Sequence, residues 1–246
     1  MRWLSYLCCI FLFINCVNCA SSIPKKEEAD VYFHLGDSYL REGKYIPALQ
    51  ELLKAVKLDP QNPDIHLELG LAYMGRGNLS TAESEFKKAL QLRPNYAAVY
   101  NNLGLLYLRQ KKWQQAEKSF KKALDIATYP TPEVAYTNLG SCYVLQHKYT
   151  QAEGTFRSAL EINPRYLPAY VGLGGLWETL NQQDKALKVY QQGIYYIPDA
   201  ATLYFRMAMI YLNKGERPKA RECLEKTIQF DNGALRQHAQ KLLETF

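Results

Sequence analysis

The sequence has few residues of the kinds that build disulfide frameworks, metal centres and active sites. It contains six cysteines and four histidines in 246 residues, and four of the cysteines fall within the first nineteen positions. No second histidine follows His66 at metalloprotease spacing, and no glycine-rich loop is followed by Lys-Ser or Lys-Thr. These absences argue against an enzyme, and they predict no cofactor, no metal ion and no small-molecule substrate.

The chain also lacks a charge stripe of one sign and a long apolar run. The formal net charge is +6, but lysines and acids are interspersed, as in Glu83, Glu85, Lys87 and Lys88. This mixture is typical of solvated helix faces, so we predict no nucleic-acid partner. The apolar stretch from Leu4 to Ile14 is shorter than the roughly 20 residues that a membrane-spanning helix needs.

Small residues recur through the chain at one interval. The glycines are spaced by 34, 34, 36 and 34 residues, and a ladder of alanines keeps the same step further along. The ladders are Gly36, Gly70, Gly104, Gly140 and Gly174, and Ala48, Ala82, Ala116, Ala152, Ala186 and Ala220. Spacing this regular indicates one helical hairpin repeated along the chain, and its period resembles that of tetratricopeptide repeats.

Each repeat predicts two helices that pack together. Counted from seven residues before the glycine, large side chains at positions 4, 7 and 11 share one helix face, and position 24 lies on a second helix with the alanine at position 20. Four repeats have glycine or asparagine at position 15, where a left-handed helix end is expected. Lys111 and His147 occupy that position in the other two repeats and are expected to do without it.

These patterns predict the fold and its boundaries. The six repeats are expected over residues 29–62, 63–96, 97–132, 133–166, 167–200 and 201–234, with a capping helix over 235–246. We therefore predict an all-α fold, a right-handed superhelical solenoid of six tetratricopeptide repeats with a C-terminal cap. Cys142 and Cys223 fall in different repeats, too far apart for a disulfide, and Cys142 and His66 are expected to be packing residues.

The N-terminus differs from the rest of the chain. Arg2, the apolar stretch and the small residues after it are typical of an export signal. Val17-Asn18-Cys19-Ala20-Ser21 resembles the lipobox of bacterial lipoproteins, in which the cysteine is acylated. We predict a signal peptide over 1–18, cleavage before Cys19, lipidation of Cys19 and a polar tether over 19–28. The alternative is plain secretion after cleavage at Ala20.

The joint between the third and fourth repeats is two residues longer than the others. It contains Tyr-Pro-Thr-Pro-Glu, followed by Ala-x-x-Asn-Leu-Gly-x-Cys. This stretch resembles the type IV pilus biogenesis and stability lipoproteins, which are secretin pilotins. The residues that carry the resemblance are Tyr129, Pro130, Pro132, Asn138, Gly140 and Cys142.

The resemblance implies a non-catalytic protein in the periplasm, anchored by lipid to the periplasmic face of the outer membrane. Such a protein would bind secretin subunits and promote their outer-membrane targeting and assembly during type IV pilus biogenesis. A general periplasmic scaffold for another envelope complex is the alternative, and an accessory module of a transferase or hydrolase is a third possibility.

The inner side of the predicted solenoid is apolar. Positions 2, 5, 9 and 12 of the first helices are expected to line it, and they predict a partner-binding groove of Phe33, Leu40, Leu67, Leu71, Met74, Leu105, Leu108 and Val144. Such a groove fits an amphipathic helix or a hydrophobic strand better than a peptide carboxylate. The alternative is that these side chains pack against neighbouring repeats.

Overall fold

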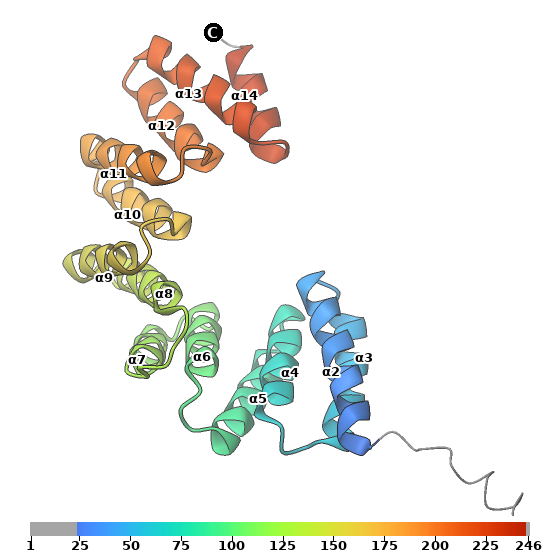
Figure 1. Ribbon diagram of the computed structural model, residues 1–246. Coiled ribbons are helices and arrows are strands. Elements are labelled where there is room, and N and C mark those ends of the chain that lie inside the picture. The colour runs from blue at the N-terminus through green and yellow to red at the C-terminus, as the bar shows by residue number, and fades with distance from the viewer. Residues whose placement is uncertain (1–23, 245–246) are drawn as a thin grey trace, which may run out of the picture. The chain divides into compact units, whose positions relative to one another are not determined.

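The computed structural model describes residues 24–244, which form thirteen α-helices and no strand (Figure 1). The helices are α2 (Lys25–Arg41), α3 (Tyr45–Leu58), α4 (Pro63–Gly75), α5 (Leu79–Leu92), α6 (Ala97–Arg109), α7 (Trp113–Leu124), α8 (Pro132–Leu145), α9 (Tyr149–Ile162), α10 (Leu167–Thr179), α11 (Gln183–Tyr196), α12 (Ala201–Asn213), α13 (Arg217–Phe230) and α14 (Ala234–Leu243). The predicted all-α repeat fold is confirmed. The predicted signal peptide and Cys19 lie outside the described residues, and within 24–244 no helix has the length and apolar character to cross a membrane.

The helices belong to two compact units. The first unit, which ends at Leu92, contains α2 to α5, and the second, which begins at Arg93, contains α6 to α14. Within each unit consecutive helices pack as hairpins, α2 with α3 and α4 with α5 in the first unit, and α6 with α7 through α12 with α13 in the second. The last helix, α14, packs on α12 and α13 (Figure 1).

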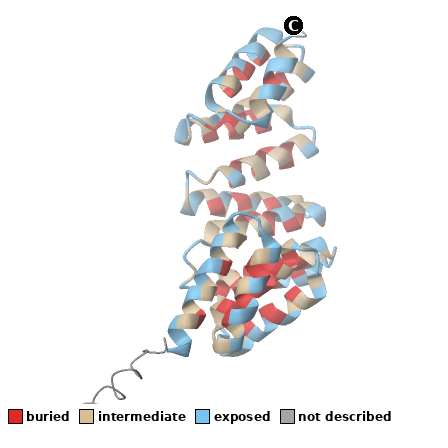
Figure 2. Cartoon of the chain, turned by 90° about the vertical axis from the view of Figure 1, so that its right-hand side faces the viewer, coloured by how far each residue is buried: buried red, intermediate tan, exposed pale blue. Residues whose placement is uncertain are grey.

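Small residues bring the two helices of a hairpin into close contact. All six alanines of the ladder are fully buried, and the buried residues gather where helices face each other (Figure 2). At Gly140 an added Cβ atom would lie 2.7 Å from the ring of Phe156, and the same conflict recurs between Gly174 and Tyr190. The glycine ladder therefore exists because a large side chain from the second helix, Leu52 in the first repeat and an aromatic ring in the next four, fills the space of a glycine side chain.

The turn inside every hairpin has one backbone geometry. Position 15 has a positive φ in all six repeats, including Lys111 at 57° and His147 at 58°. The prediction that these two residues do without the left-handed conformation is wrong. In each turn the amide of position 16 donates to the carbonyl of position 11, as Lys112 does to Tyr107 at 2.9 Å. This helix-ending hydrogen bond needs a left-handed residue, whatever its side chain.

Both ends of the described chain are helical. Helix α2 begins at Lys25, ahead of the predicted first repeat at residue 29, so the predicted tether over 19–28 is partly helix. Acids in its first turn, Glu27 and Glu28, are favoured there by the helix dipole. At the other end, α14 lies where the capping helix is predicted, with Ala239 fully buried.

The irregular joint follows a shortened helix. Helix α7 has 12 residues, whereas α5 and α9 each have 14. The Tyr129 amide donates to the Ile126 carbonyl at 3.0 Å, and its ring packs against a cluster of small side chains that includes Ala123 and Ala135. Pro132 then opens α8, where its missing N–H is not needed.

Candidate functional site

The first unit contains five residues of the predicted partner-binding groove. Leu67 and Met74 are each only 7% exposed, so they are packing residues and the prediction that they line an open groove is wrong. Phe33 and Leu40 are half-buried against the core of this unit, and Leu71 is also half-buried. We call Phe33, Leu40 and Leu71 the first-unit patch.

The second unit contains the other three groove residues. Leu105, Leu108 and Val144 are half-buried, and they pack against the core of this unit. We call them the second-unit patch. Full burial of a large apolar side chain contributes about 1.5–3 kcal/mol, so three half-buried ones can offer a partner only about 2–4 kcal/mol per patch. Each patch therefore needs further contacts to overcome the cost of association.

A carboxyl group lies beside the first-unit patch. Glu68 precedes Leu71 by one helical turn on α4, and burial, together with the nearby charge of Asp37, raises the pKa of Glu68 to about 7. Arg41 opposes this rise, but it is already bound to Asp37 at 2.7 Å. The groove prediction missed Glu68 because it occupies position 6, and only its tertiary neighbours distinguish it from a surface glutamate.

An amide pair lies beside the second-unit patch. The Asn138 side-chain amide donates to the side-chain carbonyl of Asn101 at 3.0 Å, which ties α8 to α6. Asn101 is buried, so its carbonyl needs this partner. Asn138 and Gly140, both in the stretch that resembles the pilus lipoproteins, thus have packing roles in this fold. Tyr129 is also partly buried, whereas Pro130 is exposed.

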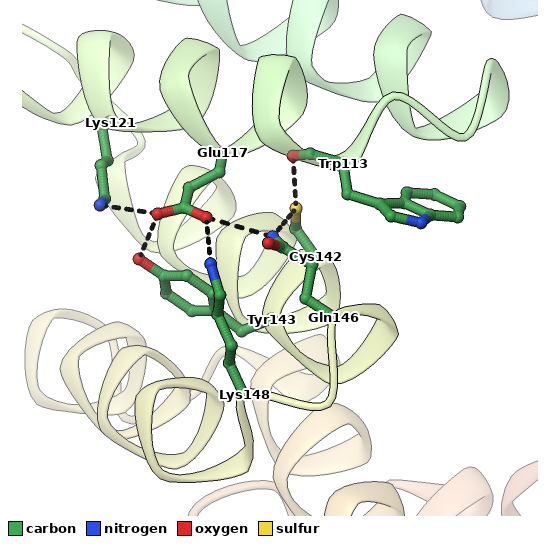
Figure 3. A network of polar contacts seen from close by, with 7 residues as sticks. All are labelled: Trp113, Glu117, Lys121, Cys142, Tyr143, Gln146 and Lys148. Atoms are coloured by element: carbon green, nitrogen blue, oxygen red, sulfur yellow. Dashed lines mark hydrogen bonds and ion pairs between the residues drawn. The ribbon is translucent and has the colours of Figure 1, made fainter.

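Cys142 is the last residue of that stretch, and it is buried between α7 and α8. Its thiol donates to the Trp113 carbonyl at 3.4 Å and accepts a hydrogen bond from Gln146 (Figure 3). Burial raises the pKa of the Cys142 thiol, which disfavours the reactive thiolate. Cys142 and Cys223 are both free and buried, so the prediction that they form no disulfide is confirmed.

Glu117 on α7 is the centre of a polar network at the same junction (Figure 3). Its carboxylate accepts from Lys121 at 2.8 Å, Lys148 at 2.9 Å, Gln146 at 3.2 Å and Tyr143 at 3.3 Å. Burial alone would raise the pKa of Glu117, but the hydrogen bonds from the two lysines and Gln146 outweigh it and lower the pKa to about 2. This network ties the third repeat to the fourth across the irregular joint.

An open pocket of about 530 Å³ lies over this network, lined by Gln114, Glu117, Lys118, Lys121, Lys122, Asp125 and Lys148. It carries four lysines and two acids, and two of the lysines already bind Glu117. All seven lining residues are polar or charged, and the shifted pKa values of Glu117 and Lys121 come from the ion pair between them. The pocket therefore shows a structural ion-pair network and not the apolar, convergent lining of a substrate site.

His66 occupies a position that holds tyrosine in every other repeat. Its Nε2 lies 2.9 Å from the Pro60 carbonyl, as the hydroxyls of Tyr170 and Tyr204 bind the equivalent proline carbonyls. Its Nδ1 lies 2.7 Å from the Glu85 carboxylate. Because both ring nitrogens face acceptors, the arrangement favours the imidazolium, and the hydrogen bond to Glu85 raises the pKa of His66.

Sequence models of the tetratricopeptide repeat match residues 36–77, 63–128, 95–165 and 201–233, which together exceed half of the chain. The chain is a tetratricopeptide repeat protein. This agrees with the hairpins, the glycine–aromatic contacts and the shared turn geometry. Proteins of this family are protein-interaction scaffolds, and no catalytic family is among those matched.

Several solved structures are similar to this tetratricopeptide repeat protein. PilF of Pseudomonas aeruginosa has a TM-score of 0.70 and 23% identity, over 90% of this chain and 99% of its own. PilW, described as a widely conserved type IV pilus biogenesis factor, has a TM-score of 0.72 and 25% identity, over 87% of this chain and 98% of its own. MamA has a TM-score of 0.57 and 26% identity over 72% of this chain. Comparison with curated proteins found no match.

Proposed function

We propose that this protein is a non-catalytic lipoprotein, anchored through Cys19 to the periplasmic face of the outer membrane, that binds secretin subunits and promotes their assembly for type IV pilus biogenesis. The two apolar patches on the first helices would hold segments of the unassembled subunit. Half-buried leucines suit this task, because they bind without exposing a fully apolar surface to water.

The similarity to PilW carries the proposal. It extends over 87% of this chain and 98% of that chain, whereas the match to MamA extends over 72% of this chain. The chain thus resembles a type IV pilus biogenesis factor along almost the whole length of that protein. The predicted export signal, Cys19 and the Tyr129–Cys142 stretch support the same function.

Membrane fractionation tests the anchor. Cys19→Ala is expected to leave the outer membrane and appear in the soluble periplasmic fraction, because one acylated cysteine is the only predicted attachment. Cys16→Ala is the matched control and should fractionate like the unaltered protein. Normal outer-membrane recovery of Cys19→Ala would contradict lipidation at this residue.

Capture of secretin subunits tests the partner. Leu71→Glu combined with Leu105→Glu places a charge in each patch, and is expected to reduce secretin capture about tenfold or more while helicity is unchanged. Ile46→Glu with Tyr195→Glu is the control, because both are exposed on second helices. Recovery of another envelope complex without secretin would select the general scaffold instead.

A further inference from the structure

The first helix of a repeat has a face that the preceding repeat covers. Position 3 and position 7 lie on this face, and in the four repeats whose predecessor is in the same unit they are at most 6% exposed. These residues are Ile65 and Leu69, Ala135 and Leu139, Ala169 and Leu173, and Leu203 and Met207. Their contacts come from the second helix of the preceding repeat, such as α3 for α4 and α7 for α8.

The same face of α2 keeps its apolar residues but has no such cover within residues 24–244. Val31 at position 3 is 61% exposed, and Leu35 at position 7 is 41% exposed. Ser38 replaces the buried apolar residue found at position 10 in those four repeats. Among residues 24–244, the apolar centre of this face is therefore open where the repeat pattern places a helix.

Acids flank the apolar centre of this face. Glu27 lies one turn before Val31, and Glu42 lies about two turns after Leu35; both side chains are exposed. The Glu42 carboxylate also binds Lys44 at 2.6 Å, in an exposed ion pair that a docked cation would have to displace or share. At 1.5 Å per residue, the backbone positions of Glu27 and of Glu42, the C-cap residue of α2, are about 22 Å apart along the helix axis, close to the length of a fourteen-residue helix. A helix with basic residues near both ends would complement them.

We propose that the exposed face of α2 is a second interaction surface, on which a protein partner docks a basic amphipathic helix in the place of a preceding repeat's second helix. Two side chains bury far less than the roughly 1,200 Å² of a stable interface, so a second copy joined through this face alone would not form a stable dimer. At the other end of the chain, α14 provides the cover that α2 lacks.

The interfaces between repeats specify the chemistry of the docked helix. Ala123 and Leu124 of α7 belong to the same apolar cluster as Ala135, the position 3 residue of α8. Ala116 and Phe120 belong to the cluster of Leu139, the position 7 residue of α8, and Phe120 also fills the space at Gly104 of its own hairpin. One stripe of small and large groups on α7 therefore contacts both first helices. Lys111, Lys112, Lys121 and Lys122 flank this stripe, which gives the α7 sequence the charge pattern that α2 complements.

The probe is a fluorescein-labelled peptide with the sequence of residues 111–126, titrated into the full processed chain. We expect saturable binding, with NMR shifts at the methyl groups of Val31 and Leu35. Val31→Lys with Leu35→Lys is expected to weaken binding at least tenfold. Glu27→Lys with Glu42→Lys is expected to weaken it about threefold, and salt should weaken binding to the unaltered chain.

Two controls are matched to these variants. Ile46→Lys with Leu53→Lys alters exposed apolar residues on α3 of the same repeat and should leave binding unchanged. A peptide with Ala116→Asp and Phe120→Asp has lost the apolar stripe and should not bind. The inference does not depend on the proposed function, because Leu71→Glu with Leu105→Glu should still bind this peptide.

Several results would overturn the proposal. Absence of saturation, equal affinity for the Val31→Lys, Leu35→Lys chain, or methyl shifts away from α2 would each do so. A dimer in sedimentation that Leu35→Lys abolishes would assign the face to a second copy. Binding that appears only after removal of the residues ahead of Pro24 would assign the face to the chain's own N-terminal segment.

Discussion

The first and second units are built from one repeat, yet they differ in what they leave exposed and in what they bury. The first unit exposes Val31 and Leu35 on α2 and Ile46 and Leu53 on α3. It also buries a charged pair, His66 with Glu85. In the second unit the last repeat is covered by α14. Identical repeat positions can therefore have opposite environments, because burial depends on the neighbour and not on the residue.

The two units also differ in how they satisfy buried polar groups. In the second unit neutral tyrosines serve this purpose, and the Tyr190 hydroxyl donates to Glu178, which with burial raises the pKa of Tyr190 above its usual range. In the first unit His66 binds the Pro60 carbonyl in place of a tyrosine, and the pKa values of His66 and of Glu68 are both raised. Between about pH 5 and 8 the first unit is therefore expected to be the pH-sensitive one.

The largest expected difference compares one repeat position in the two units. Leu139→Ala should lower the free energy of unfolding by about 2–4 kcal/mol, because Leu139 is 3% exposed and truncation of its side chain leaves a cavity. Leu35→Ala, at the same position of the first repeat, should cost less than about 1 kcal/mol. Urea unfolding of both variants measures this. Equal losses would mean that the face of α2 is covered in solution.

The next prediction concerns Glu68. Its folded pKa of about 7 exceeds the ordinary value of 4.5, so the folded state binds more protons and loses stability as pH rises through this window. The loss from pH 5 to 8 should be on the order of 2 kcal/mol. Glu68→Gln should abolish it, as measured by hydrogen exchange of the α4 amides. Glu51→Gln, an acid on the outer helix of the same unit, is the control, and an unchanged slope in Glu68→Gln would contradict the assignment.

His66→Tyr tests the other ionisable group of the first unit. The tyrosine can keep the hydrogen bond to Pro60 but not the ion pair, so a loss of about 1–2 kcal/mol is expected at pH 6. Because the pKa of His66 is raised in the folded state, its protonation stabilises the fold fully below the unfolded pKa of about 6.5. This contribution to the free energy of unfolding is lost as pH rises through the folded pKa. The deficit should therefore shrink by pH 9. Tyr170→Phe should lose about 1 kcal/mol at both pH values, and a pH-independent deficit in His66→Tyr would contradict the imidazolium.

The smallest expected effect lies in the second unit, at Glu117. Its lysine partners are about half exposed, so the network is worth only about 1 kcal/mol. Because the pKa of Glu117 is lowered in the folded state, its carboxylate stabilises the fold fully above pH 4.5, the ordinary pKa. This stabilisation is lost as pH falls to about 2, the folded pKa. Glu117→Gln should thus have a lower free energy of unfolding than the unaltered chain at pH 7 and the same one near pH 2. Unfolding followed by tryptophan fluorescence measures this. Glu153→Gln is the control: it lies in an exposed ion pair with Arg157 and should change the free energy of unfolding by less than about 0.5 kcal/mol. Equal losses for Glu117→Gln and Glu153→Gln at pH 7 would show that the network does not add to stability.

The helices and their pairing could be read from the residue pattern. The alanine ladder predicted contacts that are all fully buried, and position 15 marked every turn. The failures arose where a rule about residue type was applied to a geometric requirement. Lys111 and His147 adopt the left-handed conformation because the turn's hydrogen bond demands it, at a cost that glycine would avoid.

The candidate site was less predictable than the fold. Periodicity placed Leu67 and Leu71 on the inner side of α4, but only packing shows that the first is buried and the second half-exposed. Nothing in the sequence distinguishes Glu68 from other glutamates, since its raised pKa comes from burial and from Asp37 on another helix.

By itself the sequence determined the repeat, its six copies and the helix faces, because 3.6-residue periodicity and small-residue spacing act within one hairpin. Tertiary structure alone decided which copies of a position are covered, which carboxyl groups are removed from solvent, and that no described residue covers Val31 and Leu35 on α2. These properties depend on contacts between hairpins, and such contacts are set by which element is adjacent in space and not by the residues of one repeat.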